Sequence, residues 1–265
     1  MAVSTLIFTF GILGNIVSFM VYLAPLPTFY RVFKRKSTEG FQSLPYVVAL
    51  FSAMLWMYYG LLKSDGSLLI PINAIGCTIE SLYIIMFLVY APKSVRFSTI
   101  KMLFMVNVAL YGTILLSTYY LIHKQSTRLA ALGWICSVFS VCVFAAPLMI
   151  MRRVIRTKSV EYLPFSLSCC LTLCAVMWFF YGLLLKDYYV ALPNVLGFTF
   201  GLAQMLLYFI YRNAKQDVVP VPEVALNVVD LTKLDMEKDK NKKEAEIRDG
   251  AEPTVVIVRP SETNV

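Results

Sequence analysis

Seven long apolar stretches, separated by short segments that carry most of the charged residues, dominate this sequence. They cover approximately residues 6–30, 44–62, 68–90, 102–122, 130–151, 163–185 and 190–211. A helix needs about 20 mostly apolar residues to cross the hydrocarbon layer of a bilayer, and every stretch is close to or above that length. Only 15% of the residues are charged, whereas soluble domains carry about 25%. The pattern predicts an all-α membrane protein with seven transmembrane helices and excludes a water-soluble globular fold.

Lysine and arginine are distributed unevenly among the connections. Thirteen lie in the connections 31–43, 91–101 and 152–162 and just after residue 211. The opposite connections hold only four, namely Lys63, Lys124, Arg128 and Lys186. Because basic residues concentrate on the cytoplasmic side of membrane proteins, we expect an extracellular N-terminus and a cytoplasmic C-terminus. The basic residues are then topology signals, and we expect no nucleic-acid binding.

The chain also matches itself at an offset of 122 residues. Ala24-Pro25-Leu26 corresponds to Ala146-Pro147-Leu148, and Tyr59-Gly60-Leu61-Leu62 corresponds to Tyr181-Gly182-Leu183-Leu184. The duplicated unit contains three helices, and a single helix between the copies restores their orientation, so the two copies are parallel repeats. We expect two three-helix bundles joined by a linker helix, which is a 3+1+3 architecture.

The repeat divides the chain into four parts. We expect a first three-helix repeat at 5–91, a linker region with helix four at 92–127, a second three-helix repeat at 128–211 and a tail at 212–265. The tail has mixed charge, four prolines and no aromatic residue. Such a composition does not bury enough apolar surface to fold alone, which predicts a disordered cytoplasmic tail.

Two tryptophans and two asparagines recur at matching places in the repeats. Trp56 corresponds to Trp178, and Asn73 corresponds to Asn194 after a slip of one residue. Counting along each helix puts Trp56 and Asn73 roughly 8 to 9 Å below the extracellular surface, and Trp178 and Asn194 at nearly the same depth. An indole packs against the C–H face of a sugar, and a carboxamide both donates to and accepts from hydroxyls. Taken singly, each residue also suits an interfacial belt or a helix contact, but duplication at equal depth favours a sugar site.

Prolines form a second repeated set near the cytoplasmic side of the spans. A membrane proline removes a backbone hydrogen bond and is often a static kink, but two repeat-related pairs favour hinges that open and close the cytoplasmic half. These four are Pro25, Pro45, Pro147 and Pro164. Pro71 and Pro193 are expected in the first turn of their helices, where proline is tolerated, and we assign them no role.

Few ionisable residues lie at membrane depth. Glu80 is the only acid deep within a span, and both a functional and a structural role stay open for it. Proton-coupled carriers use chains of Asp, Glu or His, whereas His123 is the only histidine here and lies in an outer loop. The composition therefore favours uncoupled transport.

Tyr59 lies one helical turn from the outer loop, and Asp187 lies in the repeat-related loop. A hydrogen bond between them would close the outer mouth, while a solvated loop charge beside a belt tyrosine is the alternative. The sequence contains no phosphate-binding glycine loop, no Cys/His set at metal spacing and no Ser/His/Asp arrangement. We therefore expect neither an enzyme nor a cofactor or metal site.

These residues resemble the SWEET (MtN3/saliva) family of sugar transporters, over about residues 5–211. The resemblance is carried by GILGNIVSFMVYLAPLPTFYRVFKRKSTEGFQSLPY, ALFSAMLWMYYG, VFAAPL, KSVEYLPFSLS, WFFYG and KDYYVALPNVLG. The family is an established example of parallel repeats. The resemblance implies passive, bidirectional movement of mono- or disaccharides, and it is strongest to the plant branch that exports sucrose. It assigns the sugar site to Trp56, Trp178, Asn73 and Asn194, the proline tetrad to the four hinge prolines, and the outer gate to Tyr59 and Asp187.

Six further pocket positions follow from the resemblance alone: Ser18, Val21, Ser52, Ser140, Val143 and Cys174. Their small side chains leave room for a disaccharide. The hypothesis is a plasma-membrane uniporter that moves sucrose, with glucose as a weaker substrate, by alternating access. Its partners are the sugar and the lipid bilayer, and the resemblance implies a homo-oligomer. A proton-coupled sugar carrier and, less favoured, a seven-helix receptor are the alternatives.

Overall fold

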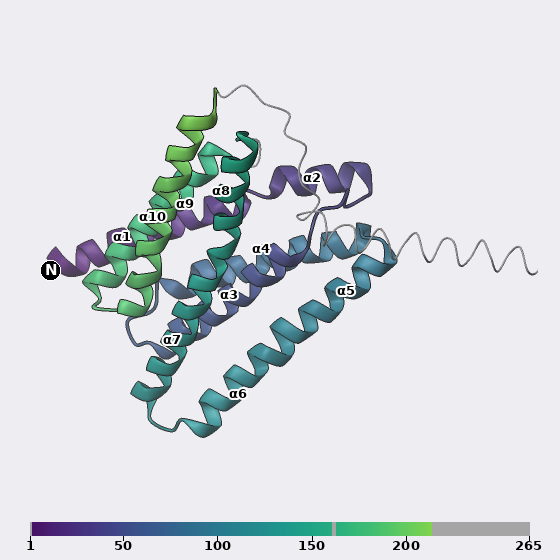
Figure 1. Cartoon of the computed structure of the whole chain (residues 1–265). Helices are drawn as coiled ribbons and strands as arrows, with labels where there is room; N and C mark the ends of the chain where they lie inside the picture. Colours follow the sequence, from purple (N-terminus) through teal and green to yellow (C-terminus); the bar gives the residue numbers. More distant parts are fainter. Residues whose placement is uncertain (1, 161–162, 214–265) are drawn as a thin grey trace, which may run out of the picture. The chain divides into compact units, whose positions relative to one another are not determined.

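The computed structural model describes residues 2–160 and 163–213, and within these ranges the regular structure is helical throughout (Figure 1). Seven helical segments in the described part of the chain are long and apolar enough to cross a membrane. They run over Ala2–Arg35, Leu44–Leu62, Leu69–Tyr90, Lys93–Leu121, Gln125–Thr157, Phe165–Leu184 and Tyr188–Tyr211. The prediction of an all-α protein with seven spans is confirmed. The predicted tail, apart from residues 212 and 213, lies outside the described residues.

The first half of the chain contains four helices. They are α1 (Ala2–Leu23), α2 (Leu26–Arg35), α3 (Leu44–Leu62) and α4 (Leu69–Tyr90). The second half repeats this order with α7 (Gln125–Val143), α8 (Ala145–Thr157), α9 (Phe165–Leu184) and α10 (Tyr188–Tyr211). Because α2 and α8 continue the first span of their half, we call α1, α3 and α4, and likewise α7, α9 and α10, the first, second and third helix of their half. Between the halves lies one long linker segment, composed of α5 (Lys93–Leu103), a π-helical stretch η1 (Phe104–Leu110) and α6 (Tyr111–Leu121).

The helices of each half pack in the same order. In the first half α4 contacts both α1 and α3, and in the second half α10 contacts both α7 and α9. The halves meet where α1 lies against α9 and where α3 lies against α7. Since α7 corresponds to α1 and α9 to α3, these two contacts are themselves related by the repeat. The linker packs along α3 of the first half.

The repeat extends to individual hydrogen bonds. Asn15 donates to the carbonyl of Leu68 over 3.0 Å, and Ser137 donates to the carbonyl of Tyr189 over 2.9 Å. Both bonds tie the first helix of a half to the start of its third helix. At the other end of each half a lysine, either Lys36 or Lys158, donates from Nζ to the hydroxyl of a tyrosine on the third helix. Helix ends are therefore fixed in the same way in both copies.

Each half has two distinct ends. We call the end that holds residue 2 and the connections α3–α4, α6–α7 and α9–α10 the amino end. The opposite end holds α2, α8 and the α4–α5 connection, carries most of the lysines and arginines, and is called the basic end. The long first and fifth spans are each interrupted near the basic end, at Ala24–Pro25 and at Phe144.

The four hinge prolines all lie where a helix starts. Pro25 and Pro164 are the N-cap residues of α2 and α9, Pro45 is in the first turn of α3, and Pro147 is the third residue of α8. A proline at a helix start removes no hydrogen bond that the helix would otherwise make. The predicted first span at 6–30 is therefore two helices with a break, and not a continuous helix that is strained by a proline.

The prediction for Pro193 is wrong. The α10 helix begins at Tyr188, so Pro193 lies inside the helix and not in its first turn. The reason is that the carboxylate of Asp187 accepts hydrogen bonds from the backbone N–H groups of Tyr189 and Val190 and starts the helix early. Pro71, by contrast, is the third residue of α4, in its first turn as expected.

Candidate functional site

A cavity of about 330 Å³ lies between the two halves. It is lined by all ten residues that the sequence analysis assigned to a pocket: Ser18, Val21, Ser52, Trp56, Asn73, Ser140, Val143, Cys174, Trp178 and Asn194. They come from α1, α3 and α4 of the first half and from α7, α9 and α10 of the second half. Each half therefore contributes its first, second and third helix to the same cavity.

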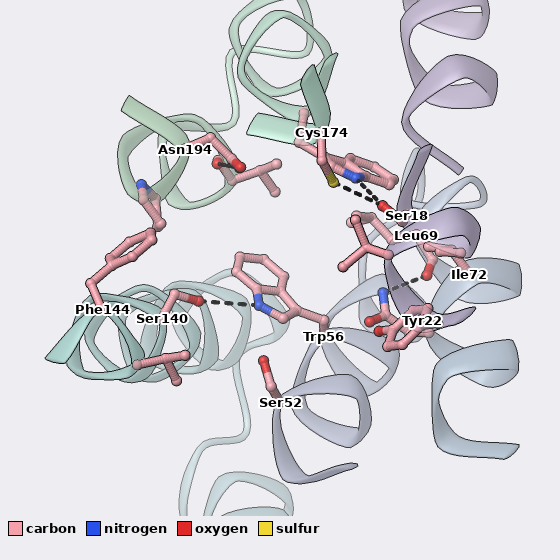
Figure 2. A pocket seen from close by; sticks show the side chains of 16 residues that line it. Ser18, Tyr22, Ser52, Trp56, Leu69, Ile72, Ser140, Phe144, Cys174 and Asn194 are labelled. Carbon is pink, nitrogen blue, oxygen red and sulfur yellow. Dashed lines mark hydrogen bonds between the residues drawn. The ribbon is translucent and has the colours of Figure 1, made fainter. Parts of the chain in front are cut away.

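The two tryptophans are held by serines of the opposite half (Figure 2). The indole N–H of Trp178 donates to Ser18 Oγ over 2.9 Å, and that of Trp56 donates to Ser140 Oγ over 3.3 Å. Ser18 and Ser140 correspond to each other in the repeat, as do the tryptophans. These reciprocal bonds fix both indoles at the wall of the cavity and join the halves there.

The two asparagines are oriented by their own helices. The amide nitrogen of Asn73 donates to the carbonyl of Leu69 over 2.7 Å, and that of Asn194 donates to the carbonyl of Val190 over 2.7 Å. These bonds fix the rotation of each carboxamide. Among the described residues, no hydrogen bond occupies either carboxamide oxygen, so both can accept one from a ligand hydroxyl.

Six residues that line the cavity were not predicted: Tyr22, Leu69, Ile72, Phe144, Val190 and Pro193. Helical spacing contains the signal for Leu69 and Val190, because each lies one turn before a predicted asparagine and therefore on the same helix face. The repeat also pairs these two positions at the offset of the asparagines. The offset of 122 residues also pairs Tyr22 with Phe144, each directly after a predicted pocket valine, so the repeat contains a signal for both aromatic residues.

The cavity is closed at the amino end by polar contacts between the halves. The hydroxyl of Tyr59 donates to Asp187 Oδ2 over 2.9 Å, and both side chains are buried. Lys63 lies between two carboxylates, 3.0 Å from Asp65 and 3.4 Å from Asp187. In the repeat-related place, the hydroxyl of Tyr181 donates to the backbone carbonyl of Asp65 over 3.4 Å.

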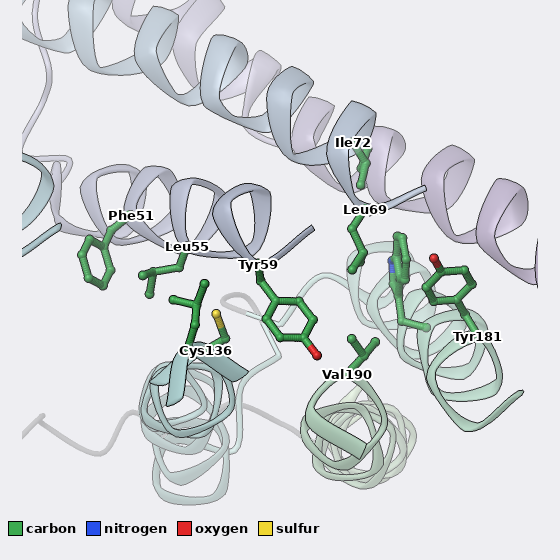
Figure 3. Packing of buried hydrophobic residues seen from close by; sticks show 10 residues of the cluster. Phe51, Leu55, Tyr59, Leu69, Ile72, Cys136, Tyr181 and Val190 are labelled. Carbon is green, nitrogen blue, oxygen red and sulfur yellow. The ribbon is translucent and has the colours of Figure 1, made fainter. Parts of the chain in front are cut away.

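Apolar side chains seal the same region (Figure 3). Figure 3 shows Tyr59 extending from α3 toward the helices that carry Cys136 and Val190. Tyr181 lies to the right of Leu69 and Val190 in this view. This cluster of buried residues draws on both halves, whereas the other two clusters among the described residues belong to the first half and the linker. Hydrogen bonds between described residues of the two halves lie at the cavity or nearer the amino end. The structure therefore represents a conformation closed at the amino end.

Comparison with known proteins agrees with this architecture. The family model described as "Sugar efflux transporter for intercellular exchange" (MtN3/saliva) matches residues 8–95 and again residues 130–216. The two matches fall on the two halves that the internal repeat defines. The family assigned by resemblance is confirmed.

Three similar curated proteins come from plants. The chain is 63% identical over 207 residues to the bidirectional sugar transporter SWEET13 of Oryza sativa subsp. japonica, with 78% of this chain and 70% of the relative covered. It is 52% identical to the bidirectional sugar transporter N3 of Medicago truncatula over 265 residues, with 96% and 98% covered. Identity to SWEET11 of Arabidopsis thaliana is 55%, with 86% and 82% covered.

One solved structure, described as a eukaryotic SWEET transporter, superimposes with a TM-score of 0.77 at 33% identity and covers 81% of this chain and 100% of that chain. The fold of this chain therefore matches that of the solved transporter over most of both halves and the linker. The chain belongs to the SWEET (MtN3/saliva) family of sugar transporters, which are multi-pass membrane proteins and not enzymes.

Proposed function

We propose that this protein is a passive uniporter that moves sucrose, and glucose more weakly, across the plasma membrane in both directions. The observation that carries the proposal is the cavity in which repeat-related pairs of tryptophan, asparagine and serine face one another from the two halves. A neutral polyol needs this combination, since it presents apolar C–H faces together with hydroxyls that donate and accept.

The size and charge of the cavity support a neutral disaccharide. Its lining contains no charged side chain, and several of the residues are small, among them Ser18, Ser52, Ser140 and Val21. A volume of about 330 Å³ lies at the lower end of the range for small-molecule sites. Sugar binding at Trp56, Trp178, Asn73 and Asn194 is the assignment that we propose.

We further propose that transport proceeds by alternating access. The amino end is extracellular, in line with the excess of lysine and arginine at the basic end. Opening at the extracellular end requires separation of Tyr59 from Asp187 and of each Trp–Ser pair, while the four prolines serve as hinges on the cytoplasmic side. Binding of the sugar between the halves shifts the population between the two conformations.

Uptake of radiolabelled sucrose into proteoliposomes tests this function. We expect sucrose to equilibrate without accumulating, at the same rate with and without an imposed pH gradient. Absence of sucrose flux would refute the substrate, and accumulation driven by the pH gradient would favour the proton-coupled alternative. We also propose that the protein forms a homo-oligomer, as the family resemblance implies, and we expect chemical cross-linking of the purified protein to yield species larger than the monomer.

Asparagine variants test the site itself. We expect Asn73→Ala and Asn194→Ala each to abolish flux while the protein still reaches the membrane, because each removes a carboxamide from the cavity. Asn107→Ala is the matched control, since it removes a carboxamide from the linker at a position that does not line this cavity, and we expect it to keep sucrose flux. Near-normal sucrose transport by both Asn73→Ala and Asn194→Ala would refute the site assignment.

A further inference from the structure

Glu80 is a buried carboxyl group that has an unsatisfied oxygen atom. Its side chain is 4% exposed, and among the described residues its Oε2 atom has no hydrogen-bond partner. No other aspartate or glutamate occurs in the seven candidate spans. Placing a carboxyl group at membrane depth without a donor is costly. The closed conformation therefore leaves an acceptor that a ligand from outside the fold can satisfy.

The position of Glu80 on α4 links it to the cavity. Asn73, Gly76 and Glu80 are spaced three and four residues apart and share one face of the helix. Glu80 lies seven residues beyond Asn73 toward the basic end, which is about 10 Å along the axis. That step is long enough for one additional sugar ring beyond the ring held at the tryptophan layer.

Tyr22 separates Glu80 from the cavity. The Tyr22 phenol lines the cavity and occupies the space over Gly76, where the Cβ of any other residue would overlap it. Gly76 lies between Asn73 and Glu80 on α4, so the ring covers the path between them. Only glycine at this place lets the phenol lie so close to the helix.

Tyr83 lies three residues after Glu80 on α4 and leaves the buried Oε2 atom of Glu80 without a hydrogen bond. The hydroxyl of Tyr83 instead donates to the backbone carbonyl of Tyr22 over 2.9 Å. This bond anchors the backbone of Tyr22 and does not involve its phenol, which lies over Gly76.

The second half lacks this feature. At the offset that aligns the asparagines, Glu80 corresponds to Gly201. A side chain at Gly201 would overlap Thr172, whose hydroxyl already donates to the carbonyl of Ser168 over 2.7 Å. The space that Glu80 occupies in one half is therefore filled by a satisfied hydroxyl in the other, and the carboxyl group of Glu80 has no counterpart at this position of the second half.

We propose that Glu80 is a second sugar-binding position on the cytoplasmic side of the central cavity. A sugar hydroxyl donates a hydrogen bond to the Glu80 carboxyl group once the Tyr22 phenol has moved off Gly76. The site serves a sugar that leaves toward, or arrives from, the cytoplasm. This inference rests on the proposed sugar-transport function and adds a second binding position to the path of the sugar.

Labelling with dicyclohexylcarbodiimide tests the proposal. This hydrophobic reagent partitions into the bilayer and modifies intramembrane carboxyl groups, and the adduct on the Glu80 peptide is measured by mass spectrometry in proteoliposomes of the full chain. We expect 0.5 M sucrose to slow adduct formation at least threefold relative to salt of equal osmolality. The Glu80→Gln variant identifies the adduct, because it removes the only candidate carboxyl group in the spans.

Cys77 provides the matched control for indirect effects. It lies on the same helix but packs into the cluster around Val47, Leu50 and Ile84 and does not line the cavity. We expect sucrose to leave the reaction of Cys77 with N-ethylmaleimide unchanged. Equal protection of Cys77 and Glu80, or no protection of Glu80 in proteoliposomes that transport sucrose, overturns the proposal. Loss of transport in the same proteoliposomes would instead refute the proposed function.

Kinetics of two variants separate binding from a purely structural role. Glu80→Gln keeps an acceptor oxygen, whereas Glu80→Leu removes it at similar volume. Since a lost hydrogen bond weakens binding about two- to tenfold, we expect the KM for sucrose efflux to rise by that factor in Glu80→Leu and by less in Glu80→Gln. Equal KM values in all three proteins overturn the proposal. If Glu80→Leu does not reach the membrane, the labelling experiment decides.

Discussion

Removal of the Tyr59 hydroxyl should open the extracellular end of the protein. Tyr59→Phe keeps a ring of the same shape in a place that is 1% exposed, and it deletes only the hydrogen bond to Asp187. Hydrogen bonds to charged groups contribute about 1.5 to 3 kcal/mol. After the substitution the Asp187 carboxylate still interacts with Lys63 and two backbone N–H groups. We therefore expect the lost free energy to lie at the lower end of this range. The ratio of open to closed protein then rises roughly tenfold, because 1.4 kcal/mol corresponds to a factor of ten.

Cys174 is a native reporter of that opening. It lines the cavity, which is sealed from the amino end in the closed conformation. A membrane-impermeant maleimide added outside intact cells reaches Cys174 only through an open extracellular end. Its labelling rate is then proportional to the open population while that population is small. We expect a tenfold faster rate in Tyr59→Phe, with Cys174→Ser as the background to subtract.

Tyr58→Phe is the matched control. It loses the same hydroxyl from the next residue of α3, but Tyr58 contacts Thr118 of the linker over 3.1 Å and does not bridge the halves. We expect its labelling rate to stay within twofold of the wild-type rate. An unchanged rate in Tyr59→Phe, or an equal rise in Tyr58→Phe, would refute the argument that the Tyr59–Asp187 bond holds the extracellular end closed.

Two further predictions follow from the contacts between and within the halves. Ser140→Ala removes the acceptor of the Trp56 indole, which costs the closed conformation about 1 kcal/mol, so labelling of Cys174 should accelerate about fivefold; a rate equal to that of the wild type contradicts this. Gly182→Ala places a Cβ 2.8 Å from the backbone nitrogen of Ala191 and should lower stability by about 1 to 3 kcal/mol, measured as a lower melting temperature in detergent. Gly112→Ala, with open space around the added carbon, is its control and should not lower that temperature.

The spans and the repeat were predictable because each depends on a one-dimensional pattern. An apolar run of about 20 residues must be helical in a bilayer, where every backbone polar group needs an internal partner. The offset of 122 residues pairs Trp56 with Trp178 and Ser18 with Ser140 without any structure. The sequence also places the ten pocket positions, six of them only through family resemblance, and the structure brings all of them to one cavity.

The partners of these residues were not predictable. Nothing in the repeat says that Trp56 bonds to Ser140 of the other half and not to Ser18 of its own, because that choice depends on how α3 lies against α7. Tyr22 likewise enters the cavity through the close approach of α1 and α4 at Gly76. The error at Pro193 has a local cause, since hydropathy alone ignores the cap that Asp187 provides. Side-chain contacts between helices and helix caps are set by tertiary geometry, which periodicity does not encode.

The closure at the amino end combines symmetric and divergent parts of the two copies. Tyr59 and Tyr181 occupy the same place in the repeat, and so do Asp65 and Asp187. Each tyrosine bonds to the aspartate of the other half, but Tyr59 reaches a carboxylate at 2.9 Å while Tyr181 reaches only a backbone carbonyl at 3.4 Å.

Lys63 strengthens only one of these two contacts. It corresponds to Leu185 in the second copy, and its ammonium group lies between Asp65 and Asp187. The hydrogen bond from Tyr59 to the charged carboxylate is shorter and stronger than the bond from Tyr181 to a neutral carbonyl. The Tyr181 bond is near the distance limit of a hydrogen bond. The duplication therefore supplies two equivalent contacts, and the divergence between the copies concentrates the free energy of closure at Tyr59, Lys63 and Asp187.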